Sequence, residues 1–285
     1  MKVKGSIVRR SAAMSSVLAA IAFAAGAGAQ TASSIPDFSS GGAAWQTGNG
    51  GDFIPVPGSP PLVTNDPAHP YVSNAIANRT GKQPTYRISD LTNPNVKQWA
   101  KEVMKKDNDE VLKGKIAYTP GSSCKPWGIP ALMLSGGPFY FVQTPKQVMM
   151  IESGDRLTRH IYMNVAHSAN PKPSWYGESI GHYEGDTLVV DTIGLNDKTF
   201  VDNYRTPHTT QLHVVERFTL GDGGKTLEAA ITVDDPGAFT MPWSAVQRWR
   251  RRDGRAVVEV VCAENSAAYF HYDVKPIPAA DRPDF

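Results

Sequence analysis

Apolar and polar side chains alternate with a period of two through most of the second half of the chain, from about residue 138 to residue 263. This period is typical of β-strands, in which successive side chains point to opposite faces of a sheet. The sequences ESGDR, YEGDT, LGDGGK and RRDGR separate alternating runs as tight hairpin connections do. The pattern predicts strands near residues 138–143, 147–153, 157–164, 178–183, 187–194, 210–220, 225–235, 243–251 and 256–264.

Strands that follow one another in this way form an antiparallel meander with almost no helix between them. We expect about nine of them to close into an up-and-down barrel of the calycin or lipocalin type, because closure removes aggregation-prone edges. A β-sandwich is the alternative. The predicted fold class is therefore mainly β, with one barrel domain over residues 89–285, and a barrel of this size can hold one small ligand.

The segment before the strands has a different composition. Residues 30–88 are rich in Gly, Pro, Ser and Asn, which predicts an extended strap lying on the domain, without helix or sheet core. One helix is predicted after it, because Asn93 is a suitable N-cap and Pro94 suits a first helical turn. It is expected to run to Met104, or as far as Leu112.

The first residues predict export. A positive n-region, an apolar alanine-rich run and an A-x-A site before Gln30 are typical of a secretory signal peptide, here residues 1–29. We therefore expect the protein in the periplasm or outside the cell, where one disulfide between Cys124 and Cys262 is the simplest use of two cysteines. The alternative is a reactive or metal-bound thiol at Cys124, beside the cation of Lys125.

Charge and motifs exclude several classes of function. The formal net charge is +2, and the densest basic run, residues 247–255, indicates an exposed hairpin, so no nucleic-acid partner is expected. No apolar run after the leader is long enough for a membrane span. The sequence has no H-E-x-x-H, paired-cysteine or P-loop motif, so neither a metal nor a cofactor is predicted; a metal held by distant histidines remains the alternative.

The stretch TPHTTQLHVVER, residues 206–217, packs two histidines, a glutamate and an arginine into a run that otherwise has the pattern of a β-strand. Because side chains alternate, Glu216 shares a face with apolar neighbours, whereas His213 and Arg217 share the other face. Either orientation carries an ionisable group inward. We expect the face with His213 and Arg217 to lie nearest the ligand, with Glu216 held by a partner; the alternative is a structural pair of Glu216 with Arg159, and histidines at the rim.

These residues suggest a pocket for acid–base chemistry. A histidine can take and give a proton near neutral pH, a tyrosine can donate one, and an arginine can bind an anion. The predicted catalytic residues are His208, His213, Tyr162 and Glu216. The predicted substrate-binding residues are Arg159, Arg217, Asp197, Trp175, Tyr176 and Trp243.

Several blocks of the sequence resemble a broad, largely uncharacterised family of exported bacterial proteins. The likeness covers about residues 90–266, carries the order EGDTLVV, ND, PH, LH, ER and DDP, and matches more loosely around SCKPWGIP. The family has no settled activity, so the resemblance implies boundaries and a motif but no reaction. The blocks that carry it are PSWYGESIGHYEGDTLVVDTIGLNDKTF, TPHTTQLHVVERF, ITVDDPGAFTMPW and VVCAEN.

The leading hypothesis from the sequence is an exported enzyme. It would act on an apolar or aromatic, anionic small molecule by cofactor-free acid–base chemistry: a lyase-type elimination or decarboxylation, an isomerisation or a hydrolysis. The alternative is a lipocalin-like carrier or sensor that binds such a molecule without chemistry, and a third hypothesis is a structural protein of the envelope. The oligomeric state is not predicted.

Overall fold

The computed structural model describes residues 35–47, 51–154, 158–254 and 257. These residues belong to one compact unit, Ser34–Phe285. The predicted signal peptide and Cys262 lie outside the described residues, so the disulfide stays a prediction. The helices are α1 (Asn74–Thr80), α2 (Gln98–Leu112) and the short 3-10 turns η1 (Ser40–Gly42), η2 (Pro120–Ser123) and η3 (Ala131–Leu134). The strands are β1 (Ala44–Thr47), β2 (Ile54–Pro55), β3 (Phe139–Gln143), β4 (Gln147–Glu152), β5 (Arg159–Met163), β6 (Glu178–Glu184), β7 (Thr187–Ile193), β8 (His213–Gly221), β9 (Thr226–Asp234) and β10 (Trp243–Arg252).

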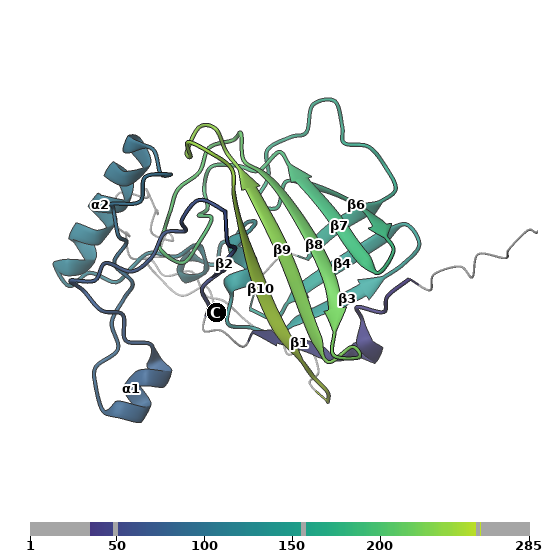
Figure 1. Ribbon diagram of the computed structural model, residues 1–285, viewed down its shortest axis with the longest axis horizontal. Coiled ribbons are helices and arrows are strands. Elements are labelled where there is room, and N and C mark those ends of the chain that lie inside the picture. The colour runs from purple at the N-terminus through teal and green to yellow at the C-terminus, as the bar shows by residue number, and fades with distance from the viewer. Residues whose placement is uncertain (1–34, 48–50, 155–157, 255–256, 258–285) are drawn as a thin grey trace, which may run out of the picture. The chain divides into compact units, whose positions relative to one another are not determined.

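The strands form one sheet that closes on itself. Its order is β1, β3, β4, β5, β6, β7, β8, β9, β10, and β1 pairs with both β3 and β10 to complete the barrel; the short β2 adds to β10 as an extra strand. Figure 1 shows the long strands β8, β9 and β10 side by side. The mainly β fold with a lipocalin-like barrel is thus confirmed, and the sandwich alternative is not.

One pairing departs from the predicted antiparallel meander. Strands β5 and β6 are parallel, with Ile161 opposite Ser179, whereas the other neighbouring strands are antiparallel. Parallel neighbours require a crossover of about a dozen residues or more. Residues 164–177 provide it, and this connection contains Pro171 and Pro173, which suit an irregular segment.

The predicted strap does more than lie on the domain. Its residues 44–47 are the strand that closes the barrel, and Trp45 is fully buried with its indole N–H donating to the Phe38 carbonyl at 2.8 Å. The strap also contains helix α1, capped by the Ser73 hydroxyl and ended by Gly81 at φ 70°. The expectation of neither helix nor sheet in this segment was therefore wrong. The last predicted strand, 256–264, lies almost wholly outside the described residues.

Helix α2 begins at Gln98, later than predicted. Asn93 does not cap it: its side chain accepts from the Asn95 backbone N–H at 2.8 Å and donates to the Pro61 carbonyl at 2.8 Å. The helix does continue to Leu112, the longer of the two predicted ends. The turn before it is thus used to anchor the strap rather than to start the helix.

Large side chains occupy the interior of the barrel. Phe139 lies edge-on to Trp249 at 5.9 Å between ring centroids, Phe141 lies edge-on to Phe218 at 5.9 Å, and Phe218 lies 6.4 Å from Trp249. Trp45 joins this buried group. Such packing stabilises the barrel but leaves its centre filled with side chains, so a ligand must be sought elsewhere.

Candidate functional site

Strand β8 turns its Glu216 face into the barrel. Leu212, Val214 and Phe218 lie on the same side and are buried, so apolar burial favours this orientation although it brings a carboxylate inside. Glu216 is fully buried and pairs with the equally buried Arg159 of β5. Arginine Nη1 donates to Glu216 Oε1 at 2.8 Å, and Nη2 donates to Oε2.

Two hydroxyl groups complete the surroundings of the guanidinium. Arg159 Nε donates to Ser179 Oγ at 3.2 Å and Nη2 donates to Thr192 Oγ1 at 2.8 Å, while the two hydroxyl oxygens lie 2.9 Å apart. Buried charges are tolerated when they are paired and hydrogen bonded in this way. The pair therefore ties β5 to β8 from inside. The predicted roles of Arg159 in substrate binding and of Glu216 in catalysis do not fit side chains with no accessible surface.

His213 and Arg217 lie on the outer face of the barrel, so the expectation that their face lies inward was wrong. His213 Nε2 is 2.9 Å from Asp191 Oδ1, and Arg217 Nη2 donates to Glu184 Oε2 at 2.6 Å. The side chains of His213 and Arg217 are 39% and 45% exposed. They sit outside because the opposite face of the strand carries the larger apolar side chains.

A second histidine joins Asp191 on this outer face. His167 places Nε2 at 2.9 Å from the same Asp191 oxygen that contacts His213, and its Nδ1 is 3.0 Å from Glu178 Oε1. The cluster ties the crossover 164–177 to the barrel wall. Within the described ranges, no group of three or more His, Cys, Asp or Glu side chains is arranged to hold a metal ion.

His208 is a buried histidine in the loop before β8. Its Nδ1–H donates to the Thr209 carbonyl at 3.0 Å, and its Nε2 accepts from Thr199 Oγ1 at 2.8 Å. Burial lowers the pKa of His208, although the Thr209 carbonyl and nearby carboxylates act against that shift. Both ring nitrogens are thus engaged in holding two loop segments together, in the neutral form of the ring.

Most of the other predicted site residues are scattered. Tyr162 is on the outer face of β5 and 49% exposed, Asp197 is exposed in a turn, Trp175 is half-buried and Tyr176 belongs to the buried core. None of these four residues lines the cavity at the end of the barrel. Trp243 is the one predicted site residue that does.

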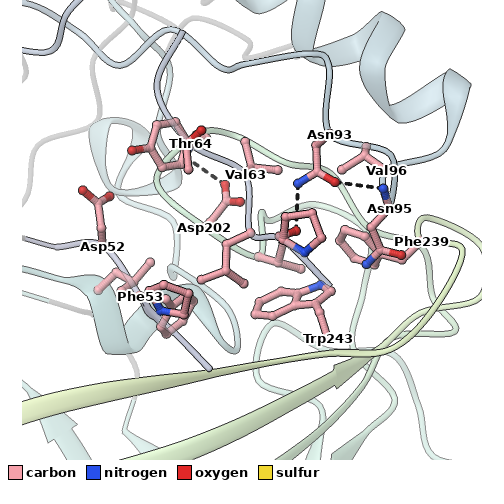
Figure 2. A pocket seen from close by; sticks show the side chains of 16 residues that line it. Asp52, Phe53, Val63, Thr64, Asn93, Asn95, Val96, Asp202, Phe239 and Trp243 are labelled. Atoms are coloured by element: carbon pink, nitrogen blue, oxygen red, sulfur yellow. Dashed lines mark hydrogen bonds between the residues drawn. The ribbon is translucent and has the colours of Figure 1, made fainter. Parts of the chain in front are cut away.

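The best candidate site is a cavity of about 440 Å³ at the end of the barrel where β10 begins. We call it the mouth cavity. Figure 2 shows it between the strap, the turn before α2 and the loops that precede β8 and β10. A volume of this size is within the range of small-molecule sites. The lining residues are Asp52, Phe53, Pro55, Pro61, Leu62, Val63, Thr64, Asn93, Asn95, Val96, Leu134, Val201, Asp202, Tyr204, Phe239 and Trp243.

Aromatic rings form one wall of the mouth cavity. Trp243 opens β10 opposite Val233 of β9, which fixes its position at the barrel end. Phe53 lies 6.0 Å from Trp243 between ring centroids, and Phe239 lies edge-on to Trp243 at 5.9 Å. Phe53 is held there because the next residue, Ile54, pairs with β10. The barrel end and the strap thus build this wall together.

Two asparagines fix the turn before α2, which lies beside the Phe239 end of the aromatic wall, because Val96 pairs with Phe239. Asn95 Oδ1 accepts from the Met241 N–H at 2.9 Å and from Thr240 Oγ1 at 2.7 Å, and Asn95 Nδ2 donates to the Met241 carbonyl at 3.0 Å. Asn93 ties the same turn to the strap through Pro61. These bonds hold the lining segments in place without a ligand.

Asp202 is the central polar group of the mouth cavity. Its Oδ1 accepts from the backbone N–H groups of Tyr204 at 2.8 Å and Thr206 at 3.1 Å, and its Oδ2 accepts from Thr206 Oγ1 at 2.7 Å. Burial raises the pKa of Asp202; these hydrogen bonds act against the shift and the carboxylate of Asp52 adds to it. Asp202 as a residue is half-buried and lines the mouth cavity.

The second carboxylate that lines the cavity, Asp52, is paired with the guanidinium of Arg87. Arg87 Nε donates to Asp52 Oδ1 at 3.1 Å and Nη2 donates to Oδ2 at 3.2 Å. The same guanidinium lies 4.1 Å from the ring centre of Tyr71 and 5.7 Å from that of Tyr204. Burial is the main cause that raises the pKa of Tyr204, so its phenol stays protonated and can donate a hydrogen bond.

Sequence reasoning missed this site because its parts are far apart along the chain. Residues near 52, 62, 93, 202 and 243 meet there, and no local spacing links them. From the sequence, Asn93, Asn95 and Asp202 could be predicted only as polar residues that hydrogen bond within loops.

Comparisons with family models, with curated proteins and with solved structures find no match for this chain. The likeness to exported bacterial proteins therefore stays a prediction. Among the helices that the structure describes, none is both long and apolar enough to cross a membrane.

Proposed function

We propose that this protein is an exported binding protein, a carrier or sensor, that takes up an apolar or aromatic small molecule in the mouth cavity. The observation that carries the proposal is the cavity itself: about 440 Å³, with aromatic and aliphatic walls and a few convergent polar groups. Sites of this composition are the default location for small ligands in a fold of unknown function.

The positions of His208 and His213, both outside the mouth cavity, favour ligand binding over catalysis by a histidine. A general base must reach the reacting molecule within hydrogen-bonding distance. His208 is buried in its loop and His213 is on the outer face, and neither lines the mouth cavity. A carrier needs only the cavity and its polar anchors.

Binding can be tested with N-phenyl-1-naphthylamine, a neutral probe whose fluorescence rises in apolar surroundings. We expect one probe per protein molecule. Leu62→Trp would fill part of the cavity and weaken binding by about tenfold or more, because a wall of the site is then occupied. Leu112→Trp is the matched control, since Leu112 is 51% exposed at the end of α2. Equal binding to both variants, or no binding to the unmodified protein, would contradict the proposal.

A second candidate is an enzyme that uses carboxyl groups instead of histidines. It is favoured by the raised pKa of Asp202 beside the carboxylate of Asp52, because two carboxyl groups with different environments can serve as acid and base. The test is to incubate a bound aromatic molecule with the protein and analyse it by mass spectrometry. A carrier returns the molecule unchanged, whereas an enzyme converts it and Asp202→Asn abolishes the conversion.

A further inference from the structure

The charges that line the mouth cavity are all of one sign. Among the described residues that line it, the ionisable side chains are Asp52, Asp202 and Tyr204, and none is a lysine, arginine or histidine. An anionic ligand would enter such a site without a cation to receive it, at a large cost in desolvation and repulsion. The cavity therefore disfavours the anionic ligand that the sequence suggested.

The cation of Arg87, close to the cavity, is already paired. Arg87 donates from Nε and Nη2 to the two oxygens of Asp52, at 3.1 and 3.2 Å, and its guanidinium lies 4.1 Å from the ring centre of Tyr71. This ion pair compensates Asp52. In the described part of the chain, the contacts of Asp202 are the hydrogen bonds from Tyr204 and Thr206, and no cation pairs with it.

Asp202 is thus a carboxylate that faces an apolar cavity without a counter-charge. Burying such a group is costly unless a cation or further donors compensate it. A ligand with a positive group would supply that compensation and would gain a charge-assisted hydrogen bond in return. The raised pKa of Asp202 has the same physical origin, since burial penalises its charged form.

The opposite wall also suits a cation. The ring of Trp243 lies 6.0 Å from that of Phe53 and 5.9 Å from that of Phe239, measured between ring centroids. All three residues line the cavity. The face of an aromatic ring carries negative potential and attracts cations, most strongly for tryptophan. Figure 2 shows these rings along the cavity with Asp52 and Asp202 on one side of it.

We propose that the ligand of the mouth cavity is an organic amine, with its ammonium group at Asp202 and its apolar body against Phe53, Phe239 and Trp243. This inference rests on the proposed binding function and names the chemical class of its ligand. Asp52 is paired with Arg87, which leaves Asp202 as the lining carboxylate without a paired cation.

Three probes of nearly equal shape test the charge. They are 4-phenylbutylamine, 4-phenylbutan-1-ol and 4-phenylbutanoate, which are cationic, neutral and anionic at pH 7. In isothermal titration calorimetry we expect the amine to bind at least about tenfold more tightly than the alcohol, and the carboxylate to bind most weakly. Equal or tighter binding of the alcohol or the carboxylate would overturn the inference.

Variants of Asp202 locate the effect. Asp202→Asn should reduce the advantage of the amine over the alcohol to about one, because Oδ1 can still accept from Tyr204 and Thr206 while the charge is lost. Asp202→Glu should restore part of the advantage. The control is Asp186→Asn, an exposed aspartate in the turn between β6 and β7 and outside the cavity, which should change nothing. An advantage that survives in Asp202→Asn would refute the role of this carboxylate.

The two proposals fail in different ways. If N-phenyl-1-naphthylamine binds and Leu62→Trp blocks it, but the amine shows no advantage, the amine inference is wrong and the binding function stands. If neither the neutral probe nor any phenylbutyl compound binds, both are wrong.

Discussion

Removing one member of the buried pair Arg159–Glu216 should strongly destabilise the barrel. In Glu216→Leu the guanidinium keeps its charge in a site with no accessible surface, and its hydrogen-bond partners are then the hydroxyl groups of Ser179 and Thr192 and the sulfur of Met150. Breaking a fully buried ion pair from one side costs about 3–5 kcal/mol. For a domain of this size each kcal/mol lowers the melting temperature by about 2–4 °C, so a fall of about 6–20 °C is expected.

The double variant Arg159→Met/Glu216→Leu should recover most of that loss. Both charges are then gone, the new side chains are apolar, and the two hydroxyls can still bond to each other across 2.9 Å. Replacing a buried pair as a whole is often neutral or stabilising, so we expect the double variant within about 2 kcal/mol of the unmodified protein. The coupling energy between the two positions would be several kcal/mol.

Urea unfolding followed by circular dichroism measures these free energies. The matched control is the exposed pair Arg217–Glu184, whose side chains are 45% and 49% accessible; Glu184→Leu should cost at most about 1 kcal/mol. If Glu216→Leu costs no more than this control, or if the double variant loses the sum of the single losses, the buried pair does not act as described.

Three further predictions concern other parts of the chain. Because burial lowers the pKa of His208, the unfolded state takes up its proton first, so stability from this group is present above pH 6.5 and is lost as the pH falls below it. In urea titrations the stability of the unmodified protein relative to His208→Asn should decline from pH 7.5 to 5.5. A constant difference would contradict this prediction. Gly177→Ala should cost about 2 kcal/mol or more, since Gly177 has φ +62° and a Cβ would lie 2.3 Å from the Ile193 carbonyl oxygen. The control Gly185→Ala meets no atom within 4 Å and should cost about 1 kcal/mol, so equal melting temperatures of the two variants would contradict this geometry. His213→Ala should leave the affinity for N-phenyl-1-naphthylamine unchanged, and a tenfold loss would return this histidine to the ligand site.

The alternation of apolar and polar residues was enough to predict the barrel, because a period of two over several hairpins permits few other folds. It did not reveal β1, since Trp45 is the one large apolar residue in a Gly-rich stretch and its partners lie in β3 and β10. Nor could it orient β8. Both faces of that strand carry ionisable side chains, and the face that lies inward is the one with the larger apolar side chains. There Glu216 pairs with Arg159, as in the alternative interpretation of the sequence.

The candidate site was harder to predict than the fold for a related reason. Its polar anchor Asp202 is in a loop and its aromatic wall begins at Trp243, so the parts meet only after the barrel and the strap have packed. Of the residues chosen from the sequence, Trp243 lines the mouth cavity, whereas the other aromatic ones, Tyr162, Trp175 and Tyr176, do not. The histidines drew attention because of their chemistry, but pairing and burial gave them other partners.

The position of β1 has a consequence for how the chain reaches its native state. Ala44 pairs with Arg252, so the seam of the barrel joins residues about two hundred positions apart, and the hairpins between β6 and β10 need no such long loop. Closing a loop of that length costs entropy before any contact compensates it, and folds dominated by distant contacts fold slowly. Barrel closure should therefore be a late kinetic step, preceded by an open sheet whose edges β3 and β10 are exposed to other chains.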